Sequence, residues 1–219
     1  MMTYQKPAEI EARSMAIITE ELQKKGICLP ADTASVIRRV IHTTADFDFA
    51  NNMHFSQGAA GAAITALRNG TDVVTDTNMA AAGIARAGLE RLGGQVYCYM
   101  ADQAVAEQAK ERETTRAVCA MQKAAQLHPG AIYAIGNAPT ALFALSALIR
   151  EGMRPALVIG VPVGFVNVAE AKEELVGCCN QAGVPVIAAM GRKGGSTVAA
   201  AICNALIYKA AGMEDPAGR

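Results

Sequence analysis

Residues 131–161 read AIYAIGNAPTALFALSALIREGMRPALVIGV, and this stretch decides the fold class. Short β-branched runs at 131–136 and 156–161 enclose a helical run that begins near Pro139 and stops at Gly152. A strand, a helix and a second strand in this order predict a right-handed crossover between parallel strands.

The same alternation extends in both directions. Further strands are predicted at 72–76, 95–100 and 185–190, with Ala-rich helices between them, and earlier helices at 7–25 and 31–42. We therefore expect an α/β fold with three layers, α/β/α, around a mainly parallel sheet of about five strands. A single domain is expected over residues 1–212, followed by a C-terminal tail at 213–219.

Composition excludes several classes of function. The chain has 219 residues, and Lys plus Arg balances Asp plus Glu at 20 each, so neither a nucleic-acid partner nor a membrane surface is expected. No apolar run reaches the roughly 18 residues of a membrane span, and the start lacks a signal pattern; we expect a cytoplasmic protein. Six cysteines without a CxxC pair predict free thiols and no metal site.

Ligands of parallel sheets bind beyond the carboxyl ends of the strands, so the loops after the predicted strands are the candidate site. The loop 191–197, GRKGGST, could bind an anion through bare amides at a helix start, helped by Arg192 and Lys193, or it could be only a tight connection. In GNAPTALF, 136–143, Asn137 suits a helix N-cap. Neither a Walker motif nor GxGxxG is present, which counts against a nucleotide-binding enzyme.

One histidine has charged neighbours at helical spacing. In the helix 31–42, the apolar side chains share one side, and Arg38, Arg39 and His42 share the other. This face could be a solvated surface that ends in a histidine favoured by the helix dipole. It could equally carry an acid–base imidazole, with a reference pKa of about 6.5, beside arginines that hold a carboxylate.

The other polar candidates are weaker. His54 is expected in a loop with a structural role, and His128 as a helix terminator. Arg112 and Arg116 would share a helix face, where neighbouring glutamates favour ordinary surface pairs. Asp46 and Asp48 could orient the His42 ring or repel substrate carboxylates, and the pattern does not decide between these roles.

Four segments in order resemble the precorrin-8X methylmutase family. They are RRVIHTTADFDF (38–49), GNAPTALFALSALI (136–149), GVPVGFVNVAEAKEEL (160–175) and GRKGGSTVAAAICNAL (191–206), and the resemblance runs from about Tyr4 to about Leu206. It implies a homodimeric isomerase of vitamin B12 biosynthesis that moves the C11 methyl of precorrin-8 or cobalt-precorrin-8 to C12, giving hydrogenobyrinic or cobyrinic acid. No cofactor is implied, because any cobalt is carried by the tetrapyrrole substrate.

The resemblance also implies roles for residues. His42 matches the family's catalytic histidine, a proton donor and acceptor for the tetrapyrrole, and Arg39 its neighbouring arginine. Substrate-binding positions are expected at Ser14, Arg39, Arg13, Arg116, Asn137, Gly194, Gly195 and Ser196. The segment 42–56 is more similar to the cobalt-containing branch, although the metal state stays open. A non-catalytic corrinoid carrier is the alternative of a different class.

Overall fold

The computed structural model describes residues 6–214. The helices are α1 Pro7–Lys24, α2 Ala34–Thr44, α3 Phe49–Asn52, α4 Ala59–Arg68, α5 Asn78–Gly83, α6 Arg86–Arg91, α7 Gln103–Glu111, α8 Arg116–Leu127, α9 Pro139–Arg150, α10 Val168–Ala182 and α11 Ser196–Ala210. The strands are β1 Met53–Phe55, β2 Val73–Thr75, β3 Val96–Tyr97, β4 Ile132–Ile135, β5 Leu157–Gly160 and β6 Val186–Ala189.

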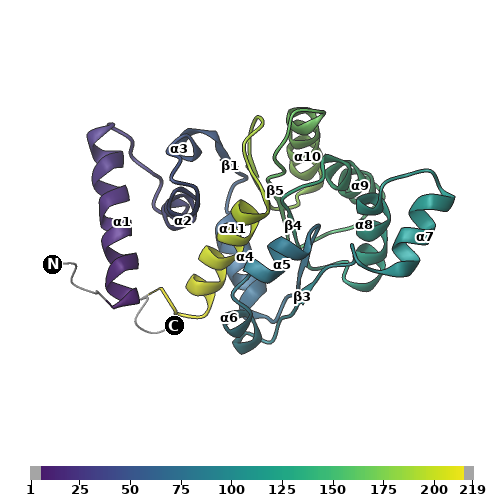
Figure 1. Cartoon of the computed structure of the whole chain (residues 1–219), viewed down its shortest axis with the longest axis horizontal. Coiled ribbons are helices and arrows are strands. Elements are labelled where there is room, and N and C mark those ends of the chain that lie inside the picture. Colours follow the sequence, from purple (N-terminus) through teal and green to yellow (C-terminus); the bar gives the residue numbers. More distant parts are fainter. Residues whose placement is uncertain (1–5, 215–219) are drawn as a thin grey trace.

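The expected three-layer α/β/α fold is confirmed (Figure 1). Within the described range the strands form a six-stranded sheet in the order β1-β6-β5-β4-β2-β3, and the neighbours from β6 to β3 pair in parallel. Each of the five expected strands contains one of these five. Strands β4, β5 and β6 are buried at every position, which explains their continuous apolar runs.

The expected number of about five strands was one too low. The missed strand, β1, pairs antiparallel with β6 at the sheet edge, with His54 opposite Ala188. His54, expected in a loop, is thus in a strand. Three residues are too few to show a period of two, so β1 owes its conformation to the edge of β6 rather than to a local pattern.

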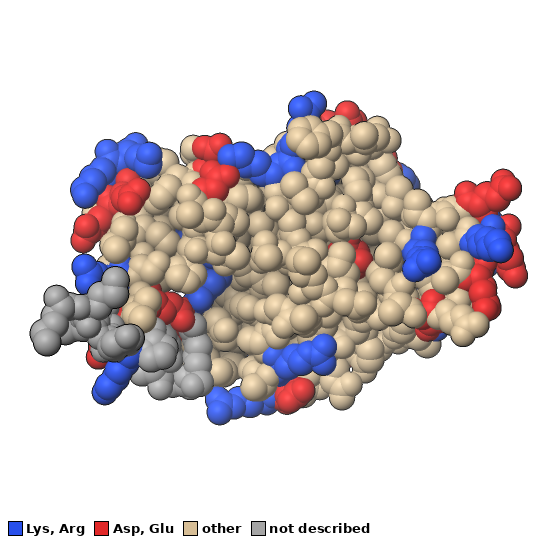
Figure 2. Space-filling model, viewed as in Figure 1, with Lys and Arg blue, Asp and Glu red and all other residues tan. Residues whose placement is uncertain are grey.

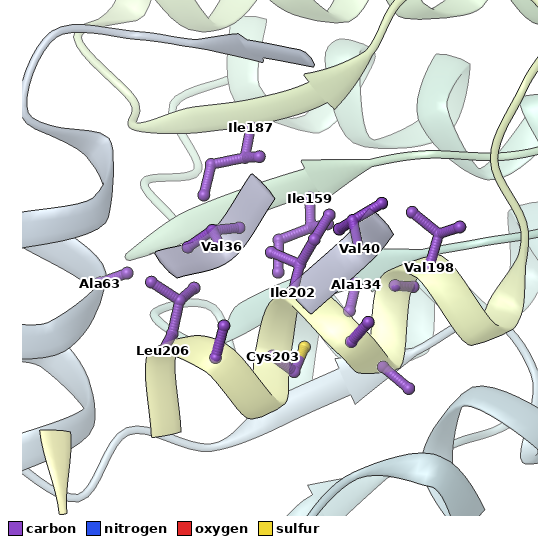
Figure 3. Packing of buried hydrophobic residues seen from close by; sticks show 14 of the residues in the cluster. Val36, Val40, Ala63, Ala134, Ile159, Ile187, Val198, Ile202, Cys203 and Leu206 are labelled. Atoms are coloured by element: carbon purple, nitrogen blue, oxygen red, sulfur yellow. The ribbon is translucent and has the colours of Figure 1, made fainter. Parts of the chain in front are cut away.

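Helix α11 is the centre of one face of the sheet. Ten of its residues are buried, five of them alanine, and these small side chains let it lie close to β4, β5, α2, α4 and α5. Figure 3 shows Ile202 and Leu206 of α11 among Val36 and Val40 of α2 and Ile159 of β5. The opposite face is covered by α7, α8, α9 and α10 over a second apolar cluster.

Helix α1 packs mainly on α2, outside the layers that touch the sheet (Figure 1). At the other end of the chain, Met213, the first residue of the expected tail, is buried. Residues 1–5 and 215–219 lie outside the described range. The expectation of a single domain over 1–212 stays a prediction, supported by one sheet with an apolar cluster on each face.

Candidate functional site

A serine–histidine pair joins α1 to α2. Ser14 Oγ lies 2.8 Å from His42 Nδ1, although the two residues are 28 positions apart in the sequence. His42 is exposed in the last turn of α2. The buried stripe of that helix faces α11 and consists of Val36, Ile37, Val40 and Ile41. Because Ser14 occupies Nδ1, Nε2 is the nitrogen left for a ligand.

Arg39 is one turn before His42 and is held by α1 and α11. Its Nη2 lies 2.6 Å from Glu11 Oε1, and its guanidinium lies over the Tyr208 ring, 5.2 Å from the centroid. One carboxylate oxygen leaves several of the five guanidinium N–H donors for another anion. Sequence reasoning missed both Glu11 and Tyr208, because neither lies near Arg39 in the chain.

A cavity of about 320 Å³ opens beside Arg38 and Arg39, between α1, α2 and α11. It is lined by Glu11, Ala12, Met15, Ser35, Arg38, Arg39, Ala205, Tyr208 and Glu214. Arg38 Nη1 donates to Thr19 Oγ1 over 3.4 Å. Arg13 is exposed on α1 and makes no hydrogen bond or ion pair with the described residues. This end of the molecule therefore combines arginines and glutamates with a partly apolar hollow.

The loop between β6 and α11 lies next to the segment that follows His42. We call residues Gly191–Gly195 the glycine loop; it projects between α3 and α10 (Figure 1). Lys193 Nζ donates to Asp46 Oδ2 at 2.6 Å and to Asp48 Oδ2 at 2.5 Å. The hydrogen bond from Lys193 lowers the pKa of Asp46, and both carboxylates raise the pKa of Lys193.

This pairing assigns Asp46 and Asp48 a role that differs from both sequence alternatives: they tether the glycine loop. The positive charge of Lys193 was expected to help bind an anion, but the two carboxylates already offset it. Arg192 lies over the exposed Phe165 ring, 5.6 Å from its centroid. The charge of Lys193 is therefore offset by carboxylates, whereas Arg192 contacts an aromatic ring and keeps its positive charge.

The start of α11 lies against the end of β4. A Cβ atom on Gly136 would come within 2.6 Å of Ser196 Cα, so only glycine allows this approach. Ser196 Oγ lies 2.8 Å from Thr77 Oγ1, and Gly195 N–H donates to Val161 O. No side chain caps α11, which leaves the first amides of the helix after Gly195 as candidate anion donors.

Asn137 is not the N-cap of α9. The N-cap is Ala138, with Pro139 at the first helical position as expected. The capping function is supplied instead by the buried Asp76 at the end of β2, whose carboxylate accepts the N–H groups of Gly136 (2.8 Å), Asn137 (2.8 Å) and Ala138 (2.7 Å). Desolvation raises the pKa of Asp76 against the opposing effect of these hydrogen bonds.

The three hydrogen bonds make Asp76→Asn a sensitive test of this loop. Asparagine turns one acceptor oxygen into a donor that faces a backbone N–H, so we expect a loss of about 1–3 kcal/mol in the free energy of unfolding, measured by urea denaturation. Asp102→Asn is the matched control, because Asp102 caps α7 from a partly exposed position where asparagine caps nearly as well, and the partly exposed ion pair with Lys123 that it removes contributes little. An equal loss in both variants would contradict the role of Asp76.

Arg112 and Arg116 do not share a helix face, contrary to expectation. Helix α7 ends before Arg112, which donates to Gln122 Oε1, and α8 begins at Arg116. Arg116 is exposed at the start of α8, and that helix lies far from α2 along the long axis (Figure 1). Its neighbour Thr115 lies 3.0 Å from Thr140 on α9, and this contact places Arg116 close to the loop that carries Asn137.

His54 and His128, the remaining histidines, lie in a strand and at a helix end, away from the Ser14–His42 pair. His128 ends α8 as expected, with Nε2 2.7 Å from Tyr99 Oη and Nδ1 3.1 Å from Asp72 Oδ2. His54 Nε2 is buried without a hydrogen-bond partner among the described residues. All six cysteines are free thiols, and within residues 6–214 no group of three His, Cys, Asp or Glu side chains is arranged to hold a metal ion.

The structure thus brings the expected site residues into two groups, which the ion pairs of Lys193 connect. Ser14, Arg39 and His42 meet at α1 and α2, with Arg13 on the same helix as Ser14. The loops with Asn137 and with Gly194, Gly195 and Ser196 meet at the carboxyl edge of β4 and β6. Arg116 lies beyond Asn137. Charged side chains surround the face in Figure 2 and are sparse in its middle.

Comparison with known proteins identifies this arrangement. The sequence pattern of the family "Precorrin-8X methylmutase" matches residues 9–209. The cobalt-precorrin-8 methylmutase of Priestia megaterium is 45% identical over 201 residues, 91% of this chain and 87% of the relative. That of Salmonella typhimurium is 42% identical over 209 residues, 93% and 96% of the two chains.

A solved structure agrees. The precorrin-8x methyl mutase from Thermus thermophilus superposes with a TM-score of 0.83 at 41% sequence identity, covering 93% of this chain and 98% of that chain. The family resemblance of the four segments is confirmed, and with it the expectation of an isomerase of cobalamin biosynthesis. The chain belongs to the precorrin-8X methylmutase family.

Proposed function

We propose that this protein converts cobalt-precorrin-8 to cobyrinic acid containing cobalt, by moving the methyl group at C11 of the macrocycle to C12. The observation that carries the proposal is the Ser14–His42 hydrogen bond, which joins two residues that the family resemblance assigns to substrate. The relatives from Priestia megaterium and Salmonella typhimurium, both named for the cobalt-containing substrate, support that branch.

His42 is the proposed proton donor and acceptor. Ser14 fixes the imidazole through Nδ1, so that Nε2 can give a proton to the conjugated system of the macrocycle next to C11, while the ring nitrogens of the cobalt form stay bound to the metal. A protonated macrocycle is poorer in electrons, which lowers the barrier to a shift of the methyl group over one face. The proton returns to Nε2 after the shift, and the reaction has no net gain or loss of atoms.

Substrate orientation is the second part of the proposal. Precorrin-8 carries a rim of acetate and propionate carboxylates, and the proposed donors are Arg13, Arg39, Arg116, Asn137 and the segment Gly194–Ser196. Within that segment the amides of Gly194 and Ser196 are the proposed donors, because Gly195 N–H is bonded to Val161 O. Together these groups are carried by α1, α2, α8, the loop before α9 and the start of α11, and α8 lies far from α2 along the long axis of the molecule (Figure 1). Holding the ring in one orientation lowers the entropic part of the barrier.

We also propose that the reaction needs no resident cofactor, because it is an intramolecular rearrangement and any cobalt is bound by the substrate ring. The six free thiols support a reducing compartment, and we propose the cytoplasm. No helix among residues 6–214 is long and apolar enough to cross a membrane.

A homodimer is the proposed assembly. The loop after β5 exposes Val163, Phe165 and Val166, with 84% of Phe165 accessible, and it is hydrogen-bonded to the glycine loop through Gly164 N–H and Arg192 O. Apolar exposure beside the site supports a second copy that covers it. Sedimentation should give twice 22.8 kDa; a single-chain mass at micromolar concentration would overturn the dimer.

The visible absorption spectrum tests the reaction. The purified protein is mixed with cobalt-precorrin-8 or with metal-free precorrin-8X, and the appearance of the corrin spectrum is followed over time. Faster conversion of the cobalt form supports the proposal, whereas faster conversion of the metal-free form would move the protein to the other branch. A spectrum that shifts on mixing and then stays constant would indicate the carrier instead.

A further inference from the structure

Lys172 is a buried lysine that the proposed mechanism leaves without a role. It lies in α10, on the face of the sheet opposite α11, and its side chain is completely buried. Its Nζ donates to Gly191 O and to Lys193 O, both at 2.8 Å. Both acceptors belong to the glycine loop, so a side chain of α10 holds the loop that follows β6.

Burying this ammonium is costly. Burial lowers the pKa of Lys172 to about 8, a direct sign that the environment disfavours the charge, yet the group is still mostly protonated at pH 7. A methionine of similar length would fill the space without the desolvation penalty. The two hydrogen bonds to the loop partly offset the cost of burying the charge. The function of this side chain is therefore to be sought in the loop.

The glycine loop has little conformational order of its own. Gly191, Gly194 and Gly195 have φ values of +74°, +158° and +135°, and glycines lose more backbone entropy on folding than other residues. Four external contacts fix the segment: Lys172 at two carbonyls, Gly164 N–H at Arg192 O, Val161 O at Gly195 N–H, and Asp46 with Asp48 at Lys193 Nζ. Of these, the Lys193 pairs are partly exposed, whereas Lys172 and the Gly195–Val161 contact are buried, and Lys172 holds two carbonyls of the loop at once.

We propose that Lys172 is a positioning residue for the tetrapyrrole: it holds the carbonyls of Gly191 and Lys193 so that the amides at the start of α11 are ready to bind a substrate carboxylate. The Lys193 side chain, fixed by the same contact, stays aligned with the segment that follows His42. This inference rests on the proposed function, because it assumes that the tetrapyrrole binds at this loop. Lys172 acts through the loop and does not touch the substrate.

The test is Lys172→Met, with Lys24→Met at the exposed end of α1 as the matched control. A contact that only helps to bind substrate raises KM, so we expect KM for cobalt-precorrin-8 to rise about 10-fold while kcat per active site stays nearly unchanged. Amide hydrogen exchange should become faster in residues 191–196 and stay the same in β4 and β5. The control should match the native chain in all three measurements.

The outcomes separate the two proposals. If the native chain converts no substrate, the proposed function has failed, and the exchange experiment still tests the loop. If the native chain is active and Lys172→Met has native KM, or native exchange in 191–196, the positioning role is wrong. A purely structural role would lower stability without changing KM. If Lys172→Met does not fold, Lys172→Gln replaces it: its amide is one atom closer to the backbone and cannot hold both carbonyls at 2.8 Å, so KM should still rise, and an unchanged KM would overturn the inference.

Discussion

Replacing His42 by alanine is expected to lower kcat for cobalt-precorrin-8 by a factor of about 10²–10⁴, the usual contribution of a positioned general acid. Substrate binding should persist, because the proposed carboxylate donors are other residues and the His42 ring is exposed. The measurement pairs a single-turnover assay of the corrin spectrum with an equilibrium titration of the substrate. A variant that binds and does not turn over is the expected result.

Two further variants test whether the loss of turnover is specific to the Ser14–His42 pair. Ser14→Ala keeps the imidazole but removes its 2.8 Å partner, and a single hydrogen bond of this kind corresponds to a loss of about 10-fold in kcat. His128→Gln removes the contacts with Tyr99 and Asp72 near the opposite edge of the sheet, and it should lower stability without lowering kcat. Native turnover in His42→Ala would remove His42 from the mechanism, and native binding without turnover in the unmodified chain would favour the carrier.

The parallel part of the fold was predictable from the sequence, since each buried strand is a continuous apolar run followed by a helix. The polar face of α2 was predictable for the same reason, because 3.6 residues per turn separate Arg39 and His42 from the buried stripe. Strand β1 was not, because it exists only through pairing with β6. The local sequence pattern therefore predicted the elements that bury their own apolar side chains. It did not predict an element that forms only by pairing with a neighbouring strand.

The candidate site follows the same division. The sequence indicated His42 and the loops, but it could not show that Arg39 is bound by Glu11 or that Lys193 is bound by Asp46 and Asp48, since these partners meet only after folding. The expectation for Arg112 and Arg116 failed because a helix boundary lies between them. Charged side chains on the surface have several partners within reach, and spacing along one helix does not select among them.

Gly194→Ala is expected to have the second largest effect on activity, although it removes no functional group. With φ at +158°, a Cβ atom at this position would overlap the carbonyl of Val161 and come within 2.9 Å of Pro162 O. The segment cannot move away freely, because Gly195 N–H is bonded to the same Val161 carbonyl. The loop must therefore shift, and a misplacement of about 1 Å can lower activity by about 10²-fold.

Steady-state kinetics and urea denaturation together separate this displacement from unfolding. We expect kcat/KM to fall by about 10²-fold while the free energy of unfolding falls by about 1–3 kcal/mol, the cost of one strained residue. Gly191→Asn is the matched control in the same loop: Gly191 has φ +74°, which asparagine tolerates, and a Cβ atom there meets nothing within 4 Å. If both variants lose activity equally, strain at any glycine matters and the start of α11 has no special role. If only Gly194→Ala loses it, the backbone at that point binds or orients the tetrapyrrole, because side-chain chemistry at His42 is unchanged in both proteins.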